Sequence, residues 1–92
     1  MAIAALFQIP KMSEAQYRQV LKTLEAKGLG APDGRRYHVA CPDGKGWTVV
    51  DVWESEAKLG KFAETLVPAL VAAGVEPPKP QVFPVANVIL GR

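Results

Sequence analysis

The dipeptide Asp43-Gly44 lies between two runs of β-compatible residues, and it constrains the fold more than any other feature of this sequence. Asp-Gly favours a two-residue type I′ hairpin turn, in which both central positions take a positive φ. We therefore expect strands over residues 35–41 and 46–53, paired antiparallel as neighbours in one sheet.

The turn also predicts the register of this hairpin. With Asp43 and Gly44 at the turn, Arg36 pairs with Asp51. Directly opposed residues point to the same face of a sheet. One face then carries Arg36, His38, Ala40, Trp47, Val49, Asp51 and Trp53, and the other carries Tyr37, Val39, Cys41, Thr48, Val50 and Val52.

A short apolar run at residues 2–9 precedes the first predicted helix. Ser13 and Gln16 have the spacing of a capping box, in which each side chain accepts a bond from the other residue's backbone N–H. Apolar residues then recur at i, i+3, i+4 and i+7 from Tyr17 onward. We expect a strand over 2–9 and a helix that ends near Lys27.

The C-terminal half predicts a second helix and a last strand. Ser55 is a natural N-cap, and an apolar stripe continues from there to Leu70. Pro68 falls within this stripe, so we expect a kink or a restarted turn there. A final strand follows over 81–90. It should lie at an edge of the sheet or contain a bulge, because Pro84 lacks an N–H.

The order β-α-β-β-α-β predicts an α+β fold of the ferredoxin-like kind, as one domain over residues 1–92. Two helices would cover one face of a four-stranded antiparallel sheet. We expect them on the aliphatic face that carries Tyr37 and Val50. The face that carries Trp47, Asp51 and Trp53 then needs a second copy of the chain, which predicts a homodimer, a dimeric α/β barrel with a cavity.

Composition excludes several classes of function. The net charge is only +2 and the basic residues are dispersed, which argues against binding to nucleic acid. Cys41 and His38 are the only residues of their kinds, so no disulfide and no metal site are expected. No apolar run is long enough to span a bilayer and no signal peptide is evident, so we expect a cytoplasmic protein without membrane contact.

With these elements in place, the chain resembles the dimeric α/β-barrel superfamily, and most nearly the small proteins grouped with the antibiotic-biosynthesis monooxygenases. The resemblance covers almost the whole chain. It rests on Val-x-Val-Trp-Glu-Ser at 50–55, on Phe62, on Leu-Val-Pro-Ala-Leu at 66–70, and on the closing strand from Val82 to Asn87. It implies a homodimer with a pocket in each subunit. It also implies oxygenation of aromatic, polyketide-like substrates without flavin, metal or any other cofactor, although other relatives degrade haem or do different chemistry.

Two positions depart from the relatives. The better-known monooxygenases carry an asparagine four residues before the tryptophan matched by Trp53, and this chain has Val49 there. The haem-degrading relatives need an axial histidine, and His38 on a central strand is not an obvious match for it.

His38 and Asp51 are the catalytic candidates, because a histidine and a carboxylate can move protons near neutral pH. Each has a structural alternative. Asp51 could form an ion pair with Arg36 across the hairpin, and His38 could simply be hydrogen-bonded within the sheet. The substrate-binding candidates are Arg36, Trp53, Phe83 and Asn87.

Two functions follow from these candidates. The first is a cofactor-independent monooxygenase or isomerase that acts on a small aromatic or polyketide-like molecule, with Trp53 and Phe83 shaping the pocket. The second is a non-catalytic homodimeric binding or accessory protein. A pocket of roughly 300 Å³ or more that contains His38 or Asp51 and is open to solvent favours the first function, whereas an interior filled by Trp47 and Trp53 favours the second.

Overall fold

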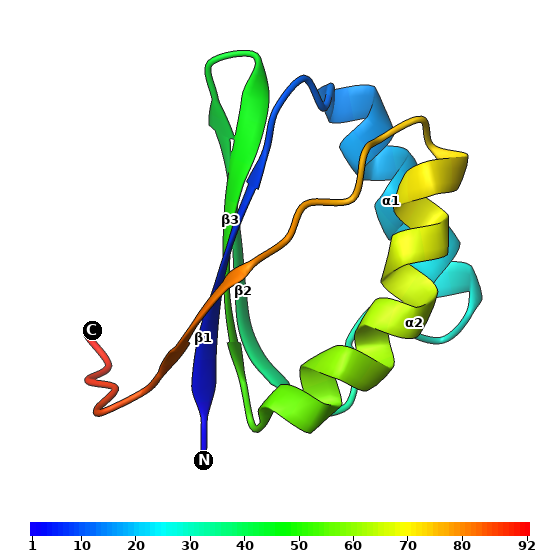
Figure 1. Cartoon of the computed structure of the whole chain (residues 1–92). Helices are drawn as coiled ribbons and strands as arrows, with labels where there is room; N and C mark the ends of the chain where they lie inside the picture. Colours follow the sequence, from blue (N-terminus) through cyan, green and yellow to red (C-terminus); the bar gives the residue numbers. More distant parts are fainter.

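A computed structural model describes all 92 residues of the chain. Four strands form one antiparallel sheet in the order β2-β3-β1-β4. Figure 1 shows both helices on the same side of this sheet, which confirms the predicted βαββαβ ferredoxin-like arrangement. The elements are β1 (Ile3–Ile9), α1 (Glu14–Ala26), β2 (Arg35–Asp43), β3 (Gly46–Trp53), α2 (Glu56–Ala72) and β4 (Gln81–Pro84).

Both helices begin where the capping residues predict. The Ser13 hydroxyl accepts a bond from the Gln16 N–H at 3.1 Å, and the Gln16 side chain accepts one from the Ser13 N–H at 2.9 Å. Ser55 caps α2 by accepting a bond from the Lys58 N–H at 3.2 Å. Helix α2 then runs to Ala72 with Pro68 inside it, so the expected restarted turn does not occur. Neither helix is both long and apolar enough to cross a bilayer.

The hairpin between β2 and β3 forms as predicted, but its turn lies one residue later. Asp43 pairs with Gly46, so Gly44 and Lys45 occupy the turn. Gly44 has a φ of +62°, whereas Lys45 has no positive φ. This is the pattern of a type II′ turn, which needs glycine at its first central position only. A type I′ turn over Asp43 and Gly44 would also force Asp43 into the left-handed region.

The shifted turn changes the partner of Asp51. His38 pairs with Asp51, and the register is irregular between Arg35 and Tyr37. The extra residue of this irregularity is Arg36, which is exposed. The predicted pairing of Arg36 with Asp51 is therefore wrong, because the turn moved the register by two positions and the bulge took Arg36 out of the ladder.

The helices cover the face of the sheet opposite to the one we predicted. Side chains buried beneath them alternate along the two central strands: Ile3, Ala5, Phe7 and Ile9 of β1, and Trp47, Val49, Asp51 and Trp53 of β3. On the outer face Tyr37, Val39 and Val50 are 42%, 54% and 41% exposed. The aromatic side chains bury more apolar area than the valines do, so covering them stabilises the fold more.

The last strand is shorter than predicted. It ends at Pro84 and pairs only with β1, so the edge position expected from that proline is confirmed. The Val85 N–H still donates to the Ala2 carbonyl at 3.0 Å. Residues 86–92 then lead away from the sheet on the side opposite the helices (Figure 1).

Two glycines offer a matched test of how tightly β1 packs against the start of β3. A Cβ on Gly46 would lie 2.3 Å from the Ile9 carbonyl oxygen, whereas one on Gly60 in α2 would meet nothing within 4 Å. Gly46→Ala should lower the free energy of unfolding by about 1–3 kcal/mol, because backbone atoms cannot move aside. Gly60→Ala should raise it by about 0.5–1 kcal/mol. Urea denaturation measures both, and equal effects would contradict the described packing.

Candidate functional site

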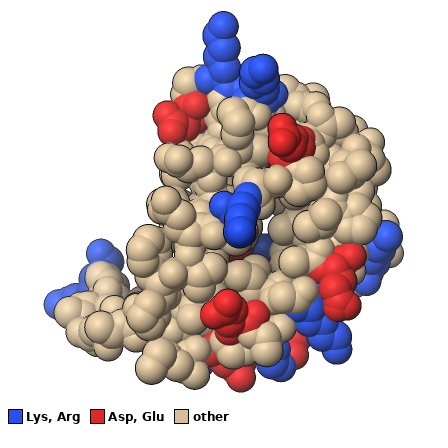
Figure 2. Space-filling model, viewed as in Figure 1, with Lys and Arg blue, Asp and Glu red and all other residues tan.

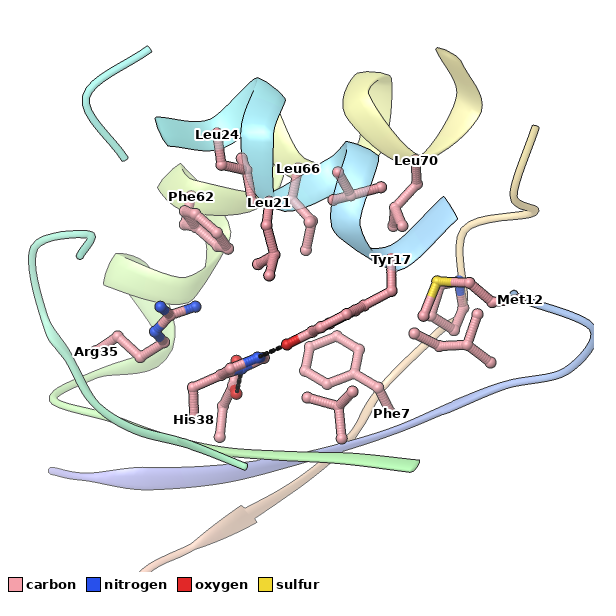
Figure 3. A pocket seen from close by; sticks show the side chains of 15 residues that line it. Phe7, Met12, Tyr17, Leu21, Leu24, Arg35, His38, Phe62, Leu66 and Leu70 are labelled. Carbon is pink, nitrogen blue, oxygen red and sulfur yellow. Dashed lines mark hydrogen bonds and ion pairs between the residues drawn. The ribbon is translucent and has the colours of Figure 1, made fainter. Parts of the chain in front are cut away.

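A pocket lies between the sheet and the two helices (Figure 3). Of its 15 lining residues, 11 are hydrophobic. The cavity holds about 60 Å³, and about 530 Å³ of atom-free space when its open mouth is included. The surface is hollowed at this place in the space-filling view (Figure 2). A water molecule needs roughly 10–15 Å³ of such space, so the enclosed part has room for about one aromatic ring.

Four side chains form a hydrogen-bonded chain at one end of this pocket. The Tyr17 hydroxyl lies 3.0 Å from His38 Nε2, and His38 Nδ1 lies 2.7 Å from Asp51 Oδ1. The other carboxylate oxygen, Oδ2, accepts a bond from the Trp53 indole N–H at 3.2 Å. Asp51 is only 4% exposed. The polar groups of the pocket are therefore linked from α1 through β2 to β3 (Figure 3).

The bond to Asp51 determines which nitrogen of His38 carries the proton. An ionised carboxylate can only accept hydrogen bonds, so Nδ1 must donate to it. In the neutral ring Nε2 then has a free lone pair, which accepts the bond from the Tyr17 hydroxyl. Nε2 is thus the basic atom of the network, and it belongs to a side chain that lines the pocket.

Tyr17 occupies the boundary between the network and the apolar pocket. Its ring stacks on Trp47 with the centroids 4.4 Å apart. Burial raises the pKa of the Tyr17 phenol, the positive charges of Arg18 and Arg35 act in the opposite direction, and the negative charge of Asp51 adds to the rise. With its pKa raised above 10, the phenol stays protonated at neutral pH and can donate to His38.

Arg35 brings the only fixed positive charge to the pocket lining. One guanidinium N–H donates to the Gly30 carbonyl at 3.2 Å, and the guanidinium carbon lies 5.7 Å from the centre of the Phe62 ring. Arg35 heads β2, just before the irregularity that turns Arg36 outward.

The structure brings together His38, Asp51 and Trp53 of the predicted site and separates the other three residues from them. Trp53 is fully buried beside Asp51, and its ring centroid lies 5.2 Å from that of Phe62. It therefore supports the network without lining the pocket. Phe83 is 51% exposed on the outer face of the sheet. Arg36 and Asn87 are exposed as well, and Asn87 follows the end of β4.

Sequence reasoning missed Tyr17 and Arg35 as site residues. The sequence pattern places Tyr17 in the apolar stripe of the first helix, where it lies, and only its hydroxyl distinguishes it from the other residues of that stripe. Arg35 reaches the pocket because of a bulge, and no local pattern in the sequence marks that bulge. No three His, Cys, Asp or Glu side chains gather closely enough to hold a metal ion.

The network has a measurable structural role. Asp51→Leu should lower the free energy of unfolding by about 1–3 kcal/mol, because the buried N–H of Trp53 loses its acceptor. Asp43→Leu is the matched control: its carboxylate accepts a bond from Thr48 at the exposed hairpin, and its loss should cost less than about 0.5 kcal/mol. Urea denaturation compares the two. An Asp51 variant as stable as the Asp43 control would contradict the described network.

No family model and no curated protein matches the sequence. Solved structures do. The NE2512 protein of unknown function from Nitrosomonas europaea is 19% identical with a TM-score of 0.70, over 99% of this chain and 95% of that one. A proposed antibiotic biosynthesis monooxygenase from Deinococcus radiodurans is 16% identical with a TM-score of 0.61, over 100% and 99%.

A third similar structure is SnoaB, a cofactor-independent oxygenase from Streptomyces nogalater. It is 12% identical with a TM-score of 0.62, over 96% of this chain and 94% of that one. At such identities the similarity establishes the fold, and it agrees with the resemblance that the sequence suggested. The chain has the fold of the antibiotic-biosynthesis-monooxygenase-like proteins.

Proposed function

We propose that this chain is a cofactor-independent monooxygenase or isomerase that acts on a small aromatic or polyketide-like molecule. The observation that carries the proposal is the chain of hydrogen bonds from Asp51 through His38 to Tyr17 at the edge of an apolar pocket. A buried carboxylate that orients a histidine is a common arrangement for a general base. The fold shared with SnoaB, a cofactor-independent oxygenase, supports the same reaction class.

In this proposal His38 Nε2 removes a proton from an acidic C–H of the substrate. Asp51 holds the ring by its Nδ1–H and stabilises the imidazolium that forms, while the indole of Trp53 keeps the carboxylate in place. The Tyr17 hydroxyl, released from Nε2, donates to the substrate oxygen on which negative charge develops. An apolar pocket strengthens these interactions, because it excludes water.

The oxygenase reaction balances without a cofactor because the substrate supplies the electrons. A CH₂ group beside a ring carbonyl loses a proton to His38 and becomes an enolate. Molecular oxygen adds at that carbon, the proton returns to give a hydroperoxide, and loss of water leaves a new carbonyl. The sum is CH₂ plus O₂ giving C=O plus H₂O. An isomerase would instead return the proton to a different carbon of the same substrate.

Val49 lines this pocket at the position where the better-known monooxygenases carry an asparagine. The amide of those proteins is therefore absent from the site. Tyr17 and Arg35 are the hydrogen-bond donors left to stabilise an oxyanion, beside the imidazole itself. This is why the proposal includes isomerisation, which needs proton transfer but no handling of oxygen.

The alternative is a non-catalytic binding or accessory protein. Two observations favour it: the pocket holds about 60 Å³, well below the roughly 300 Å³ expected of a catalytic pocket, and His38 Nε2 already has a hydrogen-bond partner in Tyr17. A binding protein would also take up an aromatic molecule, so binding alone does not separate the two functions. Proton transfer does.

We also propose that the protein is a homodimer, formed through the outer face of the sheet. The helices cover the face that we first expected a second copy to cover. The outer face is left with Tyr37, Val39, Val50 and Phe83, all more than two-fifths exposed. The C-terminal segment, residues 86–92, lies on the same side (Figure 1), and its Val88, Ile89 and Leu90 are exposed. A monomer of this size seldom leaves so much apolar surface in water.

Proton abstraction can be tested with 2-tetralone, a two-ring ketone with an acidic CH₂ between its ring and its carbonyl. In D₂O without oxygen, the protein should speed the loss of that proton's NMR signal. His38→Gln should reduce the acceleration by about 10²–10⁴-fold, because the amide cannot act as a base. Admitting oxygen then separates the two reactions: an oxygenase consumes one O₂ per substrate, and an isomerase consumes none.

Tyr37→Phe is the control for this experiment, because Tyr37 lies on the outer face and should not affect the exchange. Binding of 2-tetralone without faster exchange would reject the enzyme and favour the accessory protein. Exchange that survives in the His38 variant would assign the base to another group.

The dimer can be tested by light scattering at micromolar concentration. The mass should be about twice 9.9 kDa. Val39→Lys should shift it toward the monomer, because a charge would be buried at the interface. Val71→Lys is the matched control, since Val71 is 60% exposed on helix α2. A monomeric wild-type protein would reject this assembly.

A further inference from the structure

We propose that Arg35 binds a carboxylate, so that the molecule taken up by the pocket is a planar aromatic acid. This rests on the proposed function, because it names the substrate class of the same pocket. The inference starts from the surroundings of the Arg35 side chain. It lines a pocket whose other polar groups are His38, Asp51 and the Tyr17 hydroxyl, and no sequence pattern predicted Arg35 there.

The charge of Arg35 has no partner of opposite sign in the chain. The salt bridges join Arg18 to Glu14, His38 to Asp51 and Lys58 to Asp33, and none involves Arg35. Its two neighbours are a neutral carbonyl and an aromatic ring, those of Gly30 and Phe62. Arg35 is partly exposed and its bond to Gly30 lies at the surface, so the guanidinium is accessible to an anion that enters the pocket.

Those two neighbours hold the guanidinium in place without using up its donors. The group has five N–H bonds in one plane, and the described bond to Gly30 occupies one of them. The planar fork matches the two oxygens of a carboxylate, and such paired bonds are stronger than neutral ones.

Arg35 also lies at the same end of the pocket as the proton-transfer network. Figure 3 shows its side chain near His38 and beneath Phe62. Its positive charge acts to lower the pKa of Tyr17, against the rise caused by burial, so the two groups interact electrostatically. A ring held flat near Phe62 would place an acid group at Arg35 and a reactive carbon toward His38. The enclosed volume suits one ring, with any further ring in the mouth.

An oxyanion near Arg35 could also be the enolate formed during the reaction. The two sources differ in when the negative charge is present. A carboxylate is charged in the free ligand and contributes to binding, whereas an enolate forms only during turnover. Binding of an unreactive acid and of its neutral amide therefore distinguishes them.

The test uses 2-naphthoate and 2-naphthamide, which differ in charge and have nearly the same shape. The two tryptophans give two indole N–H signals, and Trp53 lies within the network next to the pocket, so NMR titration reports binding at the site. The wild-type protein should bind the acid about tenfold more tightly than the amide, or more. Arg35→Gln should remove this preference, and Arg35→Lys should keep part of it.

Arg36→Gln is the matched control, because it removes the same charge from the adjacent exposed position. It should leave the preference for the acid unchanged. Equal binding of acid and amide by the wild type, equal losses in the two glutamine variants, or no binding of either compound would each overturn the proposal. A clear Arg35-dependent preference for the acid, without any proton exchange on 2-tetralone, would uphold the anion site while rejecting the enzyme.

Discussion

The structure of the site depends on one buried carboxylate. Asp51 lies on the covered face of the central strand β3, where an unpaired charge would cost several kcal/mol. Two N–H donors offset that cost, one from His38 and one from Trp53. No buried side-chain nitrogen or oxygen is left without a partner. The same bonds fix the ring of His38, and through it the hydroxyl of Tyr17, so one charge orders side chains from two strands and a helix.

This arrangement explains why the gap between sheet and helices is polar at one end only. The bonds from Asp51 to Tyr17 join the sheet to α1, while Phe62 of α2 packs on the indole of Trp53. Elsewhere the two layers meet through apolar side chains, and the pocket lies among them. A base beside an apolar cavity is the environment that proton abstraction from a carbon acid requires, because water neither competes for the base nor screens the charge.

Much of the fold could be predicted from local chemistry, since capping residues, helical periodicity and an Asp-Gly turn act over a few residues. The errors arose in the strand register and in the face that the helices cover, because contacts between distant residues decide both. The observed turn needs only one positive φ, at Gly44, and it lies one residue later than predicted. This shift pairs Asp51 with His38, and the bulge removes Arg36 from the ladder. The covered face was misjudged because the predicted faces came from β2 and β3 alone. The buried alternation of β1, which includes Phe7, lies on the side of the tryptophans.

The observed faces separate two roles that the predicted arrangement placed on one face. With the polar face toward the helices, His38, Asp51, Tyr17 and Arg35 all line the pocket within a single chain. The outer face carries the exposed apolar side chains of Tyr37, Val39, Val50 and Phe83. If both proposals hold, a substitution on the outer face acts on assembly, and one in the network acts on proton transfer. The two effects should be additive, because the sheet lies between the two surfaces.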